Sequence, residues 1–434
     1  MDLHDAPLAA TAAALRSGER DLPAYIEEVC DRVDALEPEL RALLPEPDRR
    51  ARLRNAAAAL ARRYPDPAGR PPLYGVPVGV KDIFRVEGFP TRAGSQLPPE
   101  LFAGPEAAVV TALKGAGALI LGKTVTTEFA ASEPGPTRNP HNPAHTPGGS
   151  SSGSAAAVAA GYCPLALGSQ TIGSVIRPAA FCGVLGYKPT YGRVPLEGVL
   201  PYSPSVDHVG CFTQDAAGLR LAAALLVPDW RAGDDTGAGR PVLGIPEGPY
   251  LDRATPEGLA ALAAQARRLA DAGYTVRRVA AFADFAAIER RHRRLSSAEF
   301  AAVHADWFAA HEALYRPRSA ALVRDGREVG DEELATARAG RAALRDALAA
   351  AMGAAGIDLW ICPPATGPAP AGLDATGDPI MNLPWTHAGV PVVTLPAGHA
   401  ENGLPLGLQC AARAGADERL LAWAGPLAAA LKPD

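Results

Sequence analysis

The order of elements between residues 74 and 121 restricts the possible folds more than any other feature of this chain. The stretch "YGVPVGVKD" predicts a strand, because valines occupy every second position up to Lys81. The later "AAVVTALKGAG" predicts a helix that ends near Gly115, and "ALIL" at 118–121 predicts a buried strand. Two strands connected by a helix lie parallel in one sheet, so this segment predicts an α/β fold.

The same alternation returns in the second half of the chain. "RPVLGIP" and "YTVRRVA" predict strands on either side of a helix that begins at Pro256, with Thr255 as its N-cap and Gly273 as its C-cap. "DLWICPP" and "VPVVTLPAG" predict further strands, while residues 8–64 predict two helices, 282–352 predict helices and 417–431 predict a closing helix. These patterns predict an α/β fold, and the length allows one large domain or two ordinary ones.

Composition and charge exclude several classes of function. The 434 residues carry a net charge of -5 with both signs interspersed, which gives no footprint for nucleic acid or for a membrane surface. The N-terminus has neither the basic end nor the apolar segment of a signal peptide. The six cysteines stand singly, without CxxC spacing, which favours reduced thiols in a cytoplasmic protein. We expect no metal and no cofactor.

Two short motifs suggest other chemistries, and the residues around them argue against both. "GALILGKT" fits the phosphate-binding loop GxxxxGK[ST], but its four intervening residues are apolar and predict a strand. "GSSSG" fits the nucleophile elbow of a Ser-His-Asp hydrolase with Ser151 at its centre, but "PHNPAHTPG" precedes it where a strand is required. The later His208, His387 and His399 stand in apolar or turn-like settings, where structural histidines are common. A Ser-His-Asp hydrolase stays open as a minor alternative.

A longer set of motifs resembles the amidase signature family. Its centre is "GGSSSGSAAAVAAGYCPLALGSQTIGS" followed by "VIRPAAFCGVLGYKPTYGRVPLEGVLPYSPSVDHVG", residues 148–210. "PLYGVPVGVKDIFRVEGFPTRAGS" and "AGALILGKTVTTEFA" precede this centre, and "NLPWTHAGVPVVTLPAGHAENGLPLGLQ" and "ADERLL" follow it. The resemblance implies one amidase signature domain over residues 1–434, a single large α/β domain with a mixed, mostly parallel, twisted central sheet covered by helices on both faces. Its expected parts are helices packed on the core in 1–70, a catalytic core in 71–227, a variable, mostly helical region in 228–356, and the rest of the core in 357–434.

The resemblance implies a catalytic triad of two serines and one lysine. Matched motif by motif, Ser174 in "TIGS" becomes the nucleophile, Ser150 becomes the bridging serine and Lys81 becomes the base. A cis peptide bond between Gly149 and Ser150 is also implied. The oxyanion hole that the resemblance implies consists of the backbone N–H groups of Thr171, Ile172, Gly173 and Ser174.

The residue types suit this chemistry. A serine hydroxyl is a poor nucleophile unless a base takes its proton, and a lysine can do so only as a neutral amine. Free lysine has a pKa of about 10.4, so the site must lower it by burial or by nearby positive charge. The valine-rich strand that ends at Lys81 offers an apolar setting of this kind. In the structural alternative, Lys81 forms an ion pair with Asp82 or Glu128 at the strand end.

The chain departs from the family around the expected nucleophile. The family reads GTDTGGS followed by Ile-Arg, whereas this chain reads "GSQTIGS" followed by "VIRP". Gln170 replaces an acid, Ile172 replaces a glycine, and Arg177 stands one position later. Because the acid and the arginine of the family often pair beneath the loop, we expect a rebuilt support here. Ile172 also narrows the space beside the nucleophile, which favours a small or flat acyl group.

We therefore expect an amidohydrolase that cleaves a carboxamide of a linear, small-molecule substrate through an acyl-serine and releases ammonia or an amine. The alternative is the glutamine-hydrolysing A-type subunit of a tRNA-dependent amidotransferase. A non-catalytic scaffold is a minor alternative, against which the retained triad argues. We expect either a homodimer or a complex with a small accessory subunit. The aromatic residues of the variable region are expected to pack between helices rather than line a pocket; they are Trp307, Phe308, His311 and Tyr315.

Overall fold

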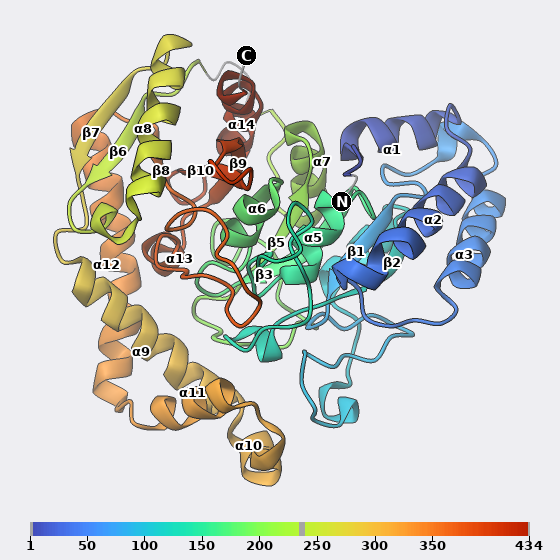
Figure 1. The fold of residues 1–434 in the computed structure, drawn as a ribbon, viewed down its shortest axis with the longest axis horizontal. Coiled ribbons are helices and arrows are strands. Elements are labelled where there is room, and N and C mark those ends of the chain that lie inside the picture. Colours follow the sequence, from blue (N-terminus) through green and yellow to red (C-terminus); the bar gives the residue numbers. More distant parts are fainter. Residues whose placement is uncertain (1–2, 234–238, 433–434) are drawn as a thin grey trace.

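Ten strands form one sheet in the computed structural model, which describes residues 3–233 and 239–432 (Figure 1). Their order across the sheet is β2-β1-β3-β5-β4-β9-β10-β8-β6-β7. The strands are β1 (Pro77–Lys81), β2 (Leu119–Thr124), β3 (Leu165–Gln170), β4 (Leu185–Lys188), β5 (His208–Thr213), β6 (Leu243–Glu247), β7 (Val276–Ala280), β8 (Leu359–Cys362), β9 (Val392–His399) and β10 (Pro405–Ala411). Strands from both halves of the chain thus share one sheet.

The sheet is mixed, as the sequence predicts. Within the described residues, β2-β1-β3 and β8-β6-β7 pair in parallel at the two ends of the sheet. The five pairings between them, from β3 through β5, β4, β9 and β10 to β8, are antiparallel. Parallel pairing therefore prevails only at the two ends, which corrects the expected mostly parallel sheet. The strands β3, β4, β5 and β10 were not predicted from the sequence; β5 and β10 follow loops, and β3 and β4 follow the short helices α5 and α6.

Helices cover the sheet on both faces. They are α1 (Leu8–Ser17), α2 (Leu22–Leu40), α3 (Arg49–Arg63), α4 (Ala108–Gly115), α5 (Ser152–Ala159), α6 (Ile176–Cys182), α7 (Ala216–Leu226), α8 (Pro256–Asp271), α9 (Phe285–Val303), α10 (Ala305–His311), α11 (Pro317–Arg327), α12 (Asp331–Ala355), α13 (Leu383–Ala388) and α14 (Asp417–Leu431). Helices α7, α8 and α14 contact strands, and α14 also contacts both α7 and α8; α5 and α6 form a second group that contacts strands and each other. Among the described residues, no helix has the length and apolar content that a membrane crossing requires.

Two local expectations need correction. Residues 8–64 form three helices rather than two, because α2 ends at Arg41, whose φ of 53° is left-handed, and the proline-containing segment that follows cannot continue a helix. The strand expected at 118–121 begins at Leu119 and runs on to Thr124, so the last six residues of the phosphate-loop match are strand, and Lys123 pairs with the buried Asp82 at 2.7 Å. The N-cap at Thr255 is confirmed, since its side chain accepts from the N–H of Gly258 at 3.2 Å.

Helices α9 to α12 extend from the β6-β7 end of the sheet as an arm (Figure 1). Trp307, Phe308 and Tyr315 of this arm pack against other rings, as expected, and the packing of His311 stays a prediction. The ring of Trp307 meets that of Phe102 edge-on at 5.2 Å, and the ring of Tyr315 lies 5.0 Å from both Phe129 and Phe308. This packing fastens the arm to the loops that follow β1 and β2, the same edge at which β1 delivers Lys81.

Candidate active site

Lys81 and Ser150 lie in hydrogen-bonding contact in the interior. Lys81 is the last residue of β1, and its side chain is fully buried. Its Nζ lies 2.7 Å from Oγ of Ser150 and 2.8 Å from Oγ of Ser169, a residue of the neighbouring strand β3. In the described part of the chain, Lys81 has no carboxylate within ion-pair distance. The structural alternative for Lys81 is wrong, because Asp82 pairs with Lys123 and Glu128 accepts from the backbone N–H of Arg316.

Burial controls the protonation of this lysine. Removal from water lowers the pKa of Lys81 well below its ordinary value of 10.5, because the charged form loses its hydration. The carboxylate of Asp207 opposes this effect and raises the same pKa. Burial is the larger effect, so the site favours a neutral amine, which is the form able to accept a proton.

The loop that carries Ser150 is fastened to helix α6. The peptide bond between Gly149 and Ser150 is cis, as the resemblance implies. Nη2 of Arg177 donates to the carbonyl oxygen of Gly149 at 2.7 Å, and burial lowers the pKa of this arginine to about 10. A Cβ atom at Gly148 would lie 2.8 Å from Cα of Pro178, so only glycine permits this approach. Because α6 begins two residues after Ser174, these contacts bring the two serine-bearing segments together.

The other serines of the loop are structural. Oγ of Ser151 donates to the Ser169 carbonyl at 3.2 Å, which leaves Ser151 buried and engaged rather than exposed on an elbow. Ser152 and Ser154 donate to the carbonyls of Gly148 and Leu167, each at 2.8 Å. The loop is thereby attached both to itself and to β3.

Ser174 lies half-buried in the turn between β3 and α6. Its hydroxyl makes no hydrogen bond to any other described residue, so the structure joins Lys81 to Ser150 but leaves the nucleophile candidate unbonded. The backbone N–H groups of Ile172, Gly173 and Ser174 likewise have no acceptor among residues 3–233 and 239–432. Three adjacent free N–H groups beside a serine suit the binding of a developing oxyanion. The N–H of Thr171, the fourth donor implied by the resemblance, stays a prediction.

The departures from the family pattern give the loop a different support. Oε1 of Gln170 accepts from the N–H groups of Val175 and Ile176, at 2.8 and 3.0 Å, and so closes the turn that holds Ser174. Arg177 bonds Gly149 rather than Gln170. The rebuilt support expected from the sequence is therefore present, with the two side chains acting separately.

The structure adds three residues that the sequence reasoning missed. Ser169 shares the amine of Lys81, Asp207 accepts from Oγ1 of Thr171 at 2.6 Å, and Thr386 donates to the Ile172 carbonyl at 2.7 Å. Ser169 could have been found, because it stands beside Gln170 in "GSQT". No spacing signal connects Thr386 to Ile172, which lies 214 residues earlier.

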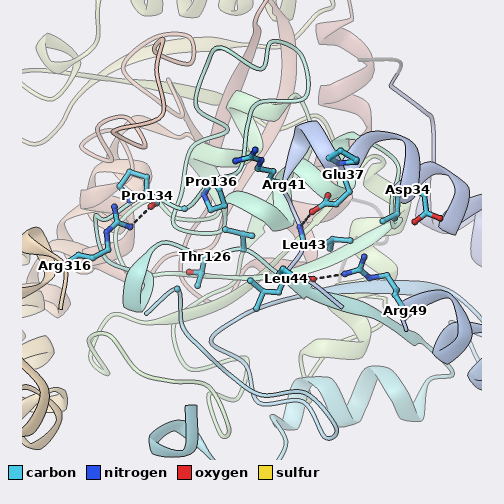
Figure 2. A pocket seen from close by; sticks show the side chains of 16 residues that line it. Asp34, Glu37, Arg41, Leu43, Leu44, Arg49, Thr126, Pro134, Pro136 and Arg316 are labelled. Carbon is cyan, nitrogen blue, oxygen red and sulfur yellow. Dashed lines mark hydrogen bonds between the residues drawn. The ribbon is translucent and has the colours of Figure 1, made fainter. Parts of the chain in front are cut away.

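A cavity near the end of α2 lies outside this site. It has a volume of about 750 Å³ and lies between the end of α2 and the loops at 125–126 and 134–136, with Arg41 and Arg316 on its sides (Figure 2). Val125 lines it, and the carbonyl of Val125 accepts from the N–H of Gly153, which links the wall of the cavity to the start of α5. A smaller cavity of about 230 Å³ touches Ser169, Thr171 and Asp207 and therefore adjoins the site directly.

No group of three or more His, Cys, Asp or Glu side chains is arranged to hold a metal ion within the residues that the structure describes. The groups that the site brings together are the hydroxyls of Ser150 and Ser169, the amine of Lys81 and the backbone N–H groups beside Ser174. This set suits acyl transfer through a serine.

Comparison with known proteins agrees with this chemistry. The profile of the family described as Amidase matches residues 24–421. The A subunit of glutamyl-tRNA(Gln) amidotransferase from Synechococcus sp. (strain RCC307) is 32% identical, over 96% of this chain and 95% of that protein. The same subunit from Salinibacter ruber is 38% identical over 61% of this chain, and there the match spans about half of the relative, 55% of its length.

Solved structures extend the likeness to the whole fold. One described as the crystal structure of amidase superposes with a TM-score of 0.88 at 32% identity and covers 98% of this chain and all of that one. Another, described as an unexpected vestigial protein complex that reveals the evolutionary origins of an s-triazine catabolic enzyme, gives 0.86 at 29% identity and covers 99% of this chain and 100% of that one. The chain therefore belongs to the amidase signature family and is a hydrolase of carbon–nitrogen bonds.

Proposed function

We propose that the protein hydrolyses the carboxamide bond of a linear amide through an acyl-enzyme on Ser174. One observation carries the proposal: a fully buried lysine without a carboxylate partner among the described residues has its Nζ 2.7 Å from the hydroxyl of Ser150. A neutral amine in this position can accept a proton from Ser150 while it donates a hydrogen bond to Ser169. A charged lysine with only two hydroxyl partners in the interior would be strongly disfavoured.

The proposed acylation moves one proton along the three side chains. Oγ of Ser174 attacks the carbonyl carbon, the Ser174 proton passes to Ser150, and the Ser150 proton passes to Lys81. The N–H groups of Ile172 and Gly173, with that of Ser174, bind the oxygen that becomes negative. When the tetrahedral intermediate collapses, the proton returns through Ser150 to the departing nitrogen, which leaves as ammonia or an amine.

Deacylation reverses this path with water as the nucleophile. Water attacks the acyl carbon and gives its proton through Ser150 to Lys81, and Ser174 takes the proton back as the acid is released. The hydroxyl of Ser174 must turn toward Ser150 for either step. Such a rotation of a partly exposed serine takes only picoseconds to nanoseconds, so the free hydroxyl in the structure is compatible with the relay.

The cavity beside Ser169 and Thr171 is the proposed place of the acyl group. Its volume of about 230 Å³ is small, and much of its wall is aliphatic. The aliphatic lining residues are Ile83, Ala130, Leu196, Val199 and Leu200. These dimensions favour a compact acyl group with an apolar part, in agreement with the narrowing expected from Ile172.

A panel of substrates tests the proposal. Short aliphatic amides, aromatic amides, ureas and glutamine are incubated with the protein, and release of ammonia is measured. We expect turnover of compact linear amides and much slower turnover of amides with bulky acyl groups. Absence of ammonia release from every member of the panel would contradict the stand-alone amidase.

The activity should depend on pH through Lys81 and should respond to Asp207. Because only the neutral amine is a base, the acylation rate should rise with pH and level off above the lowered pKa of Lys81. The Asp207 carboxylate raises this pKa, so Asp207→Asn should lower it further and move the rise of the profile to lower pH. The measurement is the acylation rate from about pH 5 to about pH 10 for both proteins. A rise that moves to higher pH, or does not move, would contradict the assigned electrostatics.

The alternative is a glutamine-hydrolysing subunit of an amidotransferase. It is supported by the relative from Synechococcus sp. (strain RCC307), which carries the name of such a subunit; the match spans 95% of that protein. The changed residues Gln170, Ile172 and Arg177 around the nucleophile favour the stand-alone enzyme. If glutamine is the only member of the panel that is hydrolysed, and only slowly without added partner subunits, the alternative is the correct one.

We also propose that the protein acts in the cytoplasm, as a homodimer or with a small accessory subunit. All six cysteines are unpaired and buried, which suits a reducing compartment. The accessory subunit is suggested by the similar protein described as part of a vestigial complex. Light scattering of the purified protein, alone and with candidate partners, measures the assembly.

A further inference from the structure

We propose that Thr386 is a positioning residue of the oxyanion hole, which aims the backbone N–H of Gly173 at the substrate by holding the carbonyl of Ile172. The proposal deepens the proposed function and rests on it. Thr386 belongs to α13, more than 200 residues after the loop in the chain order, and its side chain is fully buried.

The peptide unit between Ile172 and Gly173 links the Thr386 hydroxyl to the oxyanion hole. Oγ1 of Thr386 donates to the carbonyl oxygen of Ile172 at 2.7 Å. The carbonyl of Ile172 and the N–H of Gly173 belong to the same peptide unit, and in a planar trans peptide they point in opposite directions. A hydroxyl that holds the carbonyl toward α13 therefore turns the N–H away from α13. That N–H has no acceptor among the described residues, so it stays available to a ligand.

A second contact makes the Thr386 hydroxyl a directed donor. Nε2 of Gln170 donates to Oγ1 of Thr386 at 2.9 Å, so the oxygen acts as an acceptor toward β3 and its single proton remains for Ile172. The carbonyl of Asn382, at 3.2 Å, is the more distant of the two acceptors around this hydroxyl. The side-chain oxygen of the same Gln170 accepts hydrogen bonds from the N–H groups of Val175 and Ile176. One amide thus fixes both ends of the turn and leaves the N–H groups between them free.

The helix that bears Thr386 is itself rigidly placed against the loop. Nδ2 of Asn382, the residue before α13, donates to the carbonyl of Pro364 and to Oε1 of Gln409, both at 2.9 Å. A Cβ atom at Gly173 would lie 2.2 Å from Oδ1 of Asn382, so Asn382 packs directly on the loop and any side chain at Gly173 would displace it. With α13 fixed in this way, the Thr386 hydroxyl can define the orientation of a peptide plane rather than follow it.

Substitution of Thr386 separates positioning from packing. Thr386→Val keeps the shape and removes the hydroxyl, and it should lower kcat for amides by roughly tenfold to a hundredfold, somewhat less than loss of a whole oxyanion donor, with KM within about twofold of wild type. Thr386→Ser restores the hydroxyl and should recover kcat to within about threefold. Thr394→Val is the matched control, because Oγ1 of the buried Thr394 donates to the Ile176 carbonyl inside α6 at 3.1 Å and not to the loop. It should leave kcat unchanged.

A second measurement does not depend on turnover. Amide hydrogen exchange of the peptide that spans residues 171–175, in which the N–H of Val175 is bonded to Gln170, should be faster in Thr386→Val than in wild type, because Gln170 loses its Thr386 partner, and unchanged in Thr394→Val. A kcat of Thr386→Val within about twofold of wild type, in a protein whose Ser174→Ala variant is inactive, overturns the positioning role and leaves the proposed function standing. If wild type hydrolyses no amide, the proposed function fails. Exchange then decides the positioning role alone, and unchanged exchange in Thr386→Val overturns it.

Discussion

Replacing Lys81 with methionine is expected to lower the rate of amide hydrolysis by about a thousandfold, within the range of roughly 10² to 10⁴ that a positioned base contributes. The cause is loss of the amine that takes the proton from Ser150 and returns it. Amides depend on that return, since a departing nitrogen needs a proton. Esters with good leaving groups do not, so their hydrolysis should fall by only about tenfold. The measurement is kcat/KM for a matched amide and an activated ester of the same acid.

A second buried lysine provides the control. Lys188 is also fully buried, and its Nζ donates to the carbonyls of Pro189 and Val390 at 3.0 and 2.6 Å, with no contact to a candidate catalytic group among the described residues. Lys188→Met removes a buried amine of the same kind and should keep the ratio of amide to ester turnover of wild type. If Lys81→Met hydrolyses amides at the wild-type rate, the base has been assigned to the wrong residue.

Replacing Ser174 with alanine is expected to abolish acylation, with a loss on the order of 10⁵-fold or more in kcat, because no other side chain in the proposed mechanism forms the acyl bond. A fluorophosphonate probe gives the direct test. Wild type should gain the mass of one adduct, mapped to the peptide that holds Ser174, and Ser174→Ala should gain none. The fold should be retained, since the hydroxyl of Ser174 makes no bond within the described residues that the change could break.

Labelling of other serines provides the control and the alternative outcomes of this experiment. Ser297→Ala removes a hydroxyl in α9 that donates to the carbonyl of Arg294, at 3.1 Å, and should be labelled like wild type. If the adduct in wild type maps to Ser151 instead, the nucleophile elbow of a Ser-His-Asp hydrolase is the better interpretation. If Ser174→Ala still forms an acyl-enzyme, the assignment of the nucleophile is wrong.

Those elements whose signals are local could be predicted from the sequence. The alternating valines before Lys81, the capped helix at 256–271 and the closing helix at 417–431 lie where the patterns placed them. The strands β4 and β5 were not predicted from the sequence, because short buried strands lack the alternation of apolar and polar residues and are defined by their neighbours in the sheet. The end of α2 at Arg41 was not predicted either, since an arginine in the left-handed conformation does not mark the end of a helix in the sequence as clearly as a glycine does.

The candidate site likewise contains residues that the sequence predicted and residues that only the structure revealed. Lys81, Ser150 and the cis peptide before it followed from the motif resemblance, and the structure places the two side chains in contact. The support of the oxyanion loop by Thr386 could not be predicted, because only the folded sheet brings α13 beside β3. Gln170 was recognised as a departure from the family, but its role as a clamp on the turn required coordinates.

The position of β9 in the sheet bears on when activity can arise during synthesis. All three proposed catalytic side chains are encoded in the first 174 residues, yet β4, which pairs with β5 on one side, finds its second neighbour only when β9 emerges, and α13 directly precedes β9. Until then, the peptide plane before Gly173 has nothing to hold it. A growing chain on the ribosome therefore carries every reactive group for most of its synthesis without an assembled amidase, and competence comes with its last segment.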